Sequence, residues 1–122
     1  MVEQMTVYVV DDDHSVRTAI TTFLEGTGFL VRPYPSGTEF LRDGRPGDSS
    51  CLVIDMNMPG PSGLDVIKQL RREGNGVPAI LITGNASNRI SAAAHQAGSS
   101  FLIKPFRPEE LVKGIEQAIG RR

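Results

Sequence analysis

Four short runs of apolar residues, rich in valine and isoleucine, divide this chain and limit what it can fold into. The runs cover residues 7–10, 51–54, 79–82 and 101–103. Each is continuous rather than alternating, which is the pattern of strands buried on both faces of a parallel sheet. A weaker fifth candidate at 29–34 contains Arg32 and runs into Pro33, which is typical of an edge strand.

Helical patterns separate these runs, with apolar residues returning every three or four positions. They cover residues 16–24, 64–70, 90–97 and 108–119, and Ser36-Gly37-Thr38-Glu39 reads as a capping box that begins a further short helix. Glycines end most of these patterns, and Pro108 suits the first position of the last helix. Strands and helices therefore alternate along the whole chain.

Alternation of this kind predicts an α/β fold. Parallel strands need right-handed crossover helices, and these helices must cover both faces of the sheet. The chain has 122 residues, too few for an eight-fold barrel. We therefore predict a flavodoxin-like (βα)5 domain, a doubly wound five-stranded parallel sheet with strand order 2-1-3-4-5, because the weak second strand then lies at an edge.

The composition of the chain restricts the classes of function that it can have. Thirteen basic and fourteen acidic residues give a net charge of −1, which argues against direct binding to nucleic acid or to a membrane surface. The single cysteine, Cys51, excludes an internal disulfide and is expected in the core, while His14 and His95 have no second ligand at metal-binding spacing. We expect one soluble, cytoplasmic domain over residues 1–122, with a linker beginning at 120–122.

Polar residues follow the ends of the predicted strands. Asp11, Asp12 and Asp13 follow the first strand, Asp55 the third, Thr83-Gly84 the fourth and Lys104-Pro105 the fifth. Ligands of open α/β sheets bind beyond the carboxyl ends of the strands, near the point where the strand order reverses. These side chains should therefore meet at one edge. Taken singly, each is more often a turn residue, a helix cap or a solvated surface charge.

The electrostatics of such a meeting point favour a metal ion. Carboxylates that share a small pocket raise one another's pKa unless a cation lies between them. Oxygen ligands without histidine or cysteine favour Mg²⁺, and Lys104 supplies a second positive charge. Asp13 is expected to begin the first helix rather than to bind metal. A cation, a lysine, a hydroxyl and a central carboxylate suit phosphoryl transfer to that carboxylate.

The chain resembles the receiver domain of two-component response regulators over essentially its whole length. The resemblance rests on Asp11-Asp12, on the segment from Ile54 to Pro59 with Gly63 after it, on Thr83-Gly84, and on Lys104-Pro105-Phe106. Each motif is weak alone, but together they occur in the right order on the right strand ends. Among receivers the chain is most similar to the FixJ kind, whose full-length members carry a LuxR-type helix-turn-helix domain.

The resemblance implies a role for each acidic residue. Asp55 would accept a phosphoryl group from the phosphohistidine of a sensor histidine kinase. Asp12, Asp55 and the backbone carbonyl of Asn57 would ligate Mg²⁺, with Asp11 acting mainly through bound water.

It also implies a switch. Thr83 and Lys104 would bind the phosphoryl group, and a cis peptide is expected between Lys104 and Pro105. Thr83 and Phe101 would form the switch pair that changes the surface of the fourth helix, fifth strand and fifth helix. That surface would mediate homodimerisation and control an effector, a DNA-binding domain outside this chain that regulates transcription.

Three other functions share part of the pattern. A Mg²⁺-dependent phosphohydrolase would use Asp55 as nucleophile but needs a second carboxylate where Asn57 stands. A flavodoxin-like FMN carrier needs a phosphate-binding turn where Asp11 to Asp13 would repel phosphate. A receiver-like module that works without phosphorylation remains open, although every expected acceptor-site residue is present. We expect a signalling switch rather than a turnover enzyme.

Overall fold

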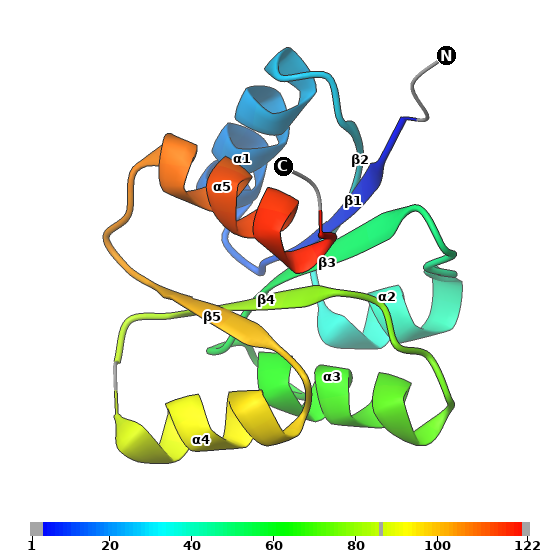
Figure 1. Cartoon of the computed structure of the whole chain (residues 1–122), viewed down its shortest axis with the longest axis vertical. Helices are drawn as coiled ribbons and strands as arrows, with labels where there is room; N and C mark the ends of the chain where they lie inside the picture. Colours follow the sequence, from blue (N-terminus) through cyan, green and yellow to red (C-terminus); the bar gives the residue numbers. More distant parts are fainter. Residues whose placement is uncertain (1–3, 86, 121–122) are drawn as a thin grey trace.

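The computed structural model describes residues 4–85 and 87–120. Their five strands form one parallel sheet in the order β2-β1-β3-β4-β5 (Figure 1). The strands are β1 (Thr6–Val10), β2 (Leu30–Tyr34), β3 (Ser50–Asp55), β4 (Ala79–Thr83) and β5 (Ser100–Ile103). The helices are α1 (His14–Gly26), α2 (Gly37–Asp43), α3 (Gly63–Arg72), α4 (Asn88–Gln96) and α5 (Pro108–Ala118). The predicted fold class and strand order are both confirmed.

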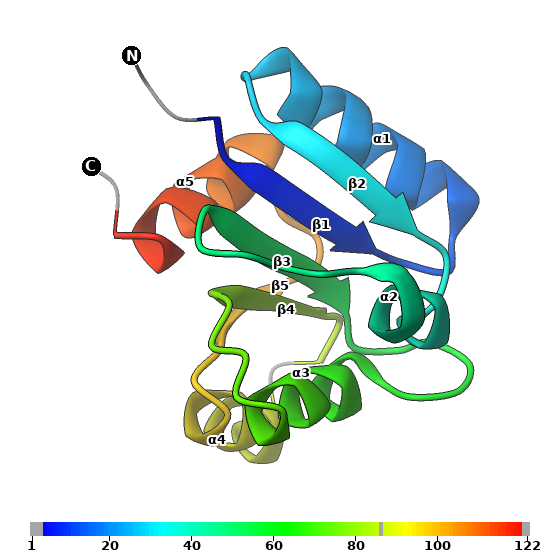
Figure 2. The same cartoon turned by 90° about the vertical axis from the view of Figure 1, so that its right-hand side faces the viewer.

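The sheet is covered on both faces. Helices α1 and α5 lie on one face, and α2, α3 and α4 lie on the other (Figures 1 and 2). Alternate residues of β1 enter the two cores, because Val7 and Val9 pack with α1 and α5 whereas Tyr8 and Val10 pack with α2 and α3. A slip of one residue would exchange these side chains between cores, so packing fixes the register of the strand.

That register brings the strand ends together. Val10 lies opposite Ile54 in the β1–β3 pair, so Asp11 and Asp55 follow at neighbouring positions. Asp55 in turn lies opposite Ile82 of β4. The carboxyl ends of β1, β3, β4 and β5 therefore form one edge of the sheet, where ligands of this architecture bind.

The two outer strands differ in how well the sequence predicts them. Strand β2 lies at an edge, as Arg32 and Pro33 indicate. The run at 101–103 reads as a strand buried on both faces, and this expectation is wrong. Phe101 and Ile103 are each 39% exposed. Strand β5 has a neighbour on one side only, and α4 and α5 leave part of its surface uncovered.

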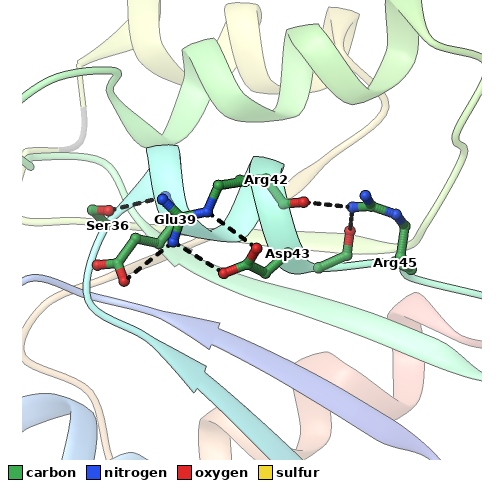
Figure 3. Close-up of polar contacts among 6 residues, drawn as sticks. Ser36, Glu39, Arg42, Asp43 and Arg45 are labelled. Atoms are coloured by element: carbon green, nitrogen blue, oxygen red, sulfur yellow. Dashed lines mark hydrogen bonds and ion pairs between the residues drawn. The ribbon is translucent and has the colours of Figure 1, made fainter.

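Helix α2 begins at a half-formed capping box (Figure 3). The hydroxyl of Ser36 accepts a hydrogen bond from the Glu39 N–H at 3.1 Å. The Glu39 carboxylate turns toward Arg42, 3.8 Å away, instead of back to the cap. A complete capping box begins α3, where Ser62 and Asp65 satisfy one another's backbone N–H groups. This box fixes the start of the helix that follows Asp55.

Cys51 is fully buried in the core, as predicted. Pro108 is the first residue of α5, also as predicted. No helix among the described residues is long and apolar enough to cross a membrane. A linker is expected to begin within residues 120–122, and of these Arg121 and Arg122 lie outside the described residues.

Candidate acidic site at the carboxyl edge of the sheet

Three carboxylates meet at the edge where the strands end. Asp11, Asp12 and Asp55 each place one oxygen within 4.8 Å of the others. Asp11 and Asp55 are buried, at 3% and 4% exposure, whereas Asp12 is exposed. The sheet register thus produces the acidic convergence that the strand-end motifs predict. Among the described residues, the cluster contains neither His14 nor His95.

Lys104, which directly follows β5, forms an ion pair with the central carboxylate, Asp55. Lys104 Nζ lies 2.9 Å from Asp55 Oδ1. The Asp55 side chain is 5% exposed and the Lys104 side chain 41%. Apart from this ion pair, Asp55 Oδ1 accepts no hydrogen bond from the described residues. A buried carboxylate oxygen so poorly satisfied has capacity for a further cationic or hydrogen-bonding partner.

The pKa shifts follow from this crowding. Burial raises the pKa of Asp11, and the charges of Asp55 and Asp12 add to the effect, against the hydrogen bond from Asp13 N–H and the charge of Lys104. Partial burial lowers the pKa of Lys104, but its hydrogen bond and charge interaction with Asp55, together with the charges of Asp11 and Asp12, outweigh this, so the net shift is upward. The lysine is therefore held firmly in its charged form.

The turn between β1 and α1 is ordered by its own backbone and side chains. Asp11 Oδ1 accepts a hydrogen bond from Asp13 N–H at 2.9 Å. Asp13 in turn caps α1 by accepting from Val16 N–H at 3.1 Å. This agrees with the expectation that Asp13 begins the helix. The first helical turn thus orients the side chain of Asp11.

Arg17 is a residue of this site that the sequence analysis missed. Its Nη1 donates to the backbone carbonyl of Asp11 at 2.7 Å. Its Nη2 lies 3.2 Å from His14 Nδ1. The available signal was its position one turn beyond the helix cap Asp13, where a long basic side chain can return to the preceding loop. Sequence spacing alone does not reveal that it chooses a carbonyl rather than a carboxylate.

Gly63 sets the distance between α3 and Asp55. A Cβ added to Gly63 would lie 2.4 Å from the Asp55 carbonyl oxygen and 2.8 Å from Leu81 Cδ1. Gly63 N–H also donates to the Met56 carbonyl at 3.1 Å. The glycine of the family motif is therefore required here for close backbone approach, and it brings α3 against the residue that carries the central carboxylate.

The predicted hydroxyl lies at the same edge but is engaged with its own loop. Thr83 is 1% exposed at the end of β4. Its Oγ1 accepts from Asn85 N–H and donates to the Asn85 carbonyl, both at 3.1 Å. Asn57 lies exposed in the loop after β3. The peptide between Lys104 and Pro105 is cis, as expected.

The donors fit the metal that the sequence suggests. The cluster offers hard carboxylate oxygens and no histidine or cysteine, which suits Mg²⁺ and not zinc. One of these oxygens, Asp55 Oδ1, is buried and has no hydrogen-bond partner among the described residues beyond its ion pair with Lys104. Asp11, Asp12 and Asp55 could therefore hold a hard divalent cation.

Known proteins resemble this chain over almost its whole length. Residues 7–116 match the model of the response regulator receiver domain. The transcriptional regulatory protein FixJ of Azorhizobium caulinodans is 35% identical over 122 residues, which is 99% of this chain and 58% of that protein. The response regulator TodT of Pseudomonas putida is 37% identical over 114 residues, 93% of this chain and 50% of that protein. The crystal structure of FixJ-N superimposes with a TM-score of 0.85 at 30% identity, covering 99% of this chain and 98% of that one.

This chain belongs to the response regulator receiver domain family. Receivers are signalling switches, and the curated relatives include regulators of transcription. The chain spans between half and three-fifths of the length of FixJ and TodT.

Proposed function

We propose that Asp55 accepts a phosphoryl group and that its phosphorylation switches the surface of the domain. One observation carries the proposal most directly. Asp55 is a buried carboxylate with an ion-pair partner, Lys104, and two further carboxylates beside it. Burial of the Asp11 and Asp55 carboxylates costs stability, so a fold retains them most readily for chemistry.

The transfer step is a substitution at phosphorus. A carboxylate oxygen of Asp55 attacks the phosphorus of a phosphohistidine on a sensor kinase. The new O–P bond forms as the N–P bond breaks, and the departing imidazole nitrogen keeps the electron pair and takes a proton from solvent. The product is an aspartyl phosphate, and the substitution is neither an oxidation nor a reduction.

The surrounding residues have distinct tasks in this step. Asp11, Asp12, Asp55 and the backbone carbonyl of Asn57 would hold Mg²⁺, which when bound neutralises charge on the phosphoryl oxygens. Lys104 Nζ, now 2.9 Å from Asp55 Oδ1, transfers its contact to a phosphoryl oxygen. The burial of Asp55 and Thr83 limits the access of water to the acyl phosphate.

Thr83 carries the change from the site to the surface. Its hydroxyl leaves the Asn85 carbonyl, to which it donates at 3.1 Å, and donates to the phosphoryl group instead. The exposed ring of Phe101 on the neighbouring strand then moves inward. The α4, β5 and α5 surface changes as a two-state element biased by one charge event.

The partners follow from this cycle. A sensor histidine kinase supplies the phosphoryl group in the cytoplasm. The altered α4–β5–α5 surface forms a homodimer and controls a DNA-binding effector domain in the longer protein. We expect no direct binding of this chain to DNA, since its net charge of −1 gives no general attraction to phosphate groups. The role is that of a switch, and multiple turnover of small phosphoesters is not expected.

Intact-protein mass spectrometry tests the proposal. The chain is incubated with acetyl phosphate and Mg²⁺, with acetyl phosphate and a chelator, and as the Asp55→Asn variant. We expect one added phosphoryl group that requires both Mg²⁺ and Asp55. Asp43→Asn is the matched control, because Asp43 is an exposed aspartate on α2 that pairs with Arg42. A phosphoryl group retained by Asp55→Asn, or none gained by the wild type, would contradict the proposal.

A further inference from the structure

We propose that Arg17 is a positioning residue for the acidic cluster. Its guanidinium holds the peptide group between Asp11 and Asp12, so that both carboxylates stay directed at Asp55 and can bind a divalent cation. The inference rests on the proposed function for the identity of the cation. According to this inference, cation affinity depends on Arg17 as well as on the acidic ligands.

The first support is the hydrogen bond itself. Arg17 Nη1 donates to the Asp11 carbonyl at 2.7 Å. That carbonyl belongs to the peptide that joins Asp11 to Asp12, so its direction determines where the Asp12 side chain leaves the backbone. Asp11 is 3% exposed, so its carbonyl has little access to solvent as an alternative partner.

The second support is the repulsion within the cluster. Oxygens of Asp11, Asp12 and Asp55 lie within 4.8 Å of one another. Among the described residues, the basic side chain that forms an ion pair with this cluster is Lys104, which contacts Asp55. Like charges so close favour separation of the loop from the sheet. Asp11 is held at three atoms: Oδ1 accepts from Asp13 N–H, the carbonyl accepts from Arg17, and the backbone N–H donates to the Tyr34 carbonyl at 3.2 Å. The loop is thus fixed before any cation arrives.

The third support is the choice of acceptor. Among the described residues Arg17 forms no salt bridge with a carboxylate, and its other guanidinium contact is His14 Nδ1 at 3.2 Å. The guanidinium therefore acts on backbone geometry. The positioning role of Arg17 and its positive charge predict opposite effects on cation affinity when the residue is replaced. Removal of a positive charge near an acidic site strengthens cation binding, whereas loss of the peptide anchor weakens it.

The experiment measures the Mg²⁺ dissociation constant by isothermal titration calorimetry at low ionic strength. Wild type, Arg17→Met, Arg17→Lys and Arg72→Met are compared, each with its urea midpoint. Arg72→Met is the matched control, because Arg72 is exposed at the end of α3 far from Asp55. Outer residues that orient metal ligands change affinity about 10–100-fold when lost. We expect Arg17→Met to weaken Mg²⁺ binding by about tenfold and Arg72→Met to leave it unchanged.

The lysine variant covers the case in which Arg17→Met does not fold. Arg17→Lys keeps the charge but loses the planar donor fork, so it should also weaken Mg²⁺ binding, by a smaller factor. An unchanged or smaller dissociation constant in the folded variants would overturn the inference. So would a lower urea midpoint with unchanged affinity, which indicates a purely structural residue. If the wild type itself binds no Mg²⁺, the proposed cation site fails instead.

Discussion

Gly63→Ala tests whether close packing of α3 against β3 positions the phosphoacceptor. The added Cβ would lie 2.4 Å from the Asp55 carbonyl oxygen, and ordinary contact begins at 3.4 Å. About 1 Å of displacement must be shared between α3 and β3, since the Asp55 oxygen is backbone and cannot swing away. Overpacking of this kind costs about 1–3 kcal/mol, against which alanine regains up to about 1 kcal/mol of helix propensity.

The Gly63→Ala substitution should lower both the free energy of unfolding and the rate of phosphorylation. We expect a free energy of unfolding lower by about 1–2 kcal/mol, which lowers Tm by about 4–8 °C in a domain of this size. A misplacement of about 1 Å at a reacting group costs about 100-fold in rate. If Asp55 takes half of the displacement, the rate of phosphorylation by acetyl phosphate should fall by about tenfold.

Thermal unfolding by circular dichroism and intact mass over time give the two quantities. Gly114→Ala is the matched control, because Gly114 is also helical and its added Cβ would lie 3.4 Å from Ile80 Cδ1. That variant should unfold at the same temperature as the wild type or higher, and be phosphorylated at the same rate. A Gly63→Ala protein with the Tm and rate of the wild type would refute the close-approach argument.

Two further predictions concern buried titratable groups. The pKa of Asp11 is raised, chiefly by burial, so the folded state binds this proton more tightly than the unfolded state and stability falls as the pH rises through the folded pKa. Asp11→Asn should therefore raise the urea midpoint at pH 7 without divalent cations and lose that gain near pH 3; an equal midpoint at pH 7 would contradict this. Burial raises the pKa of Cys51 to about 12, so a thiol reagent at pH 8 should label it only as urea unfolds the chain, and rapid labelling of folded protein would contradict its burial.

Much of the architecture could be predicted because it depends on local patterns. Continuous apolar runs identify β1, β3 and β4, since a strand covered on both faces needs apolar residues at successive positions. Pro33 places β2 at an edge because it has no N–H for a further strand. Once the strand order is known, Asp11, Asp55 and Lys104 must come to the same edge.

The errors and omissions concern contacts between distant groups. Residues 101–103 read as buried, but Phe101 and Ile103 are exposed because coverage depends on where α4 and α5 lie. Glu39 has the right spacing for a capping box, yet it pairs with Arg42, one turn further along α2. The choice of a carbonyl by Arg17 requires the path of the loop in space. Spacing predicts which groups can reach one another and leaves open which partner each prefers.

The measurement that tests the central claim most directly is chemical identification of the phosphorylated residue. An aspartyl phosphate is reduced by borohydride to homoserine, whereas a free carboxylate is not. The chain should be phosphorylated with acetyl phosphate and Mg²⁺, reduced, digested and sequenced by tandem mass spectrometry. We predict homoserine at position 55 alone, absent when the phosphoryl donor is omitted. Homoserine at Asp11, Asp12 or any other position, with Asp55 intact, would contradict the account.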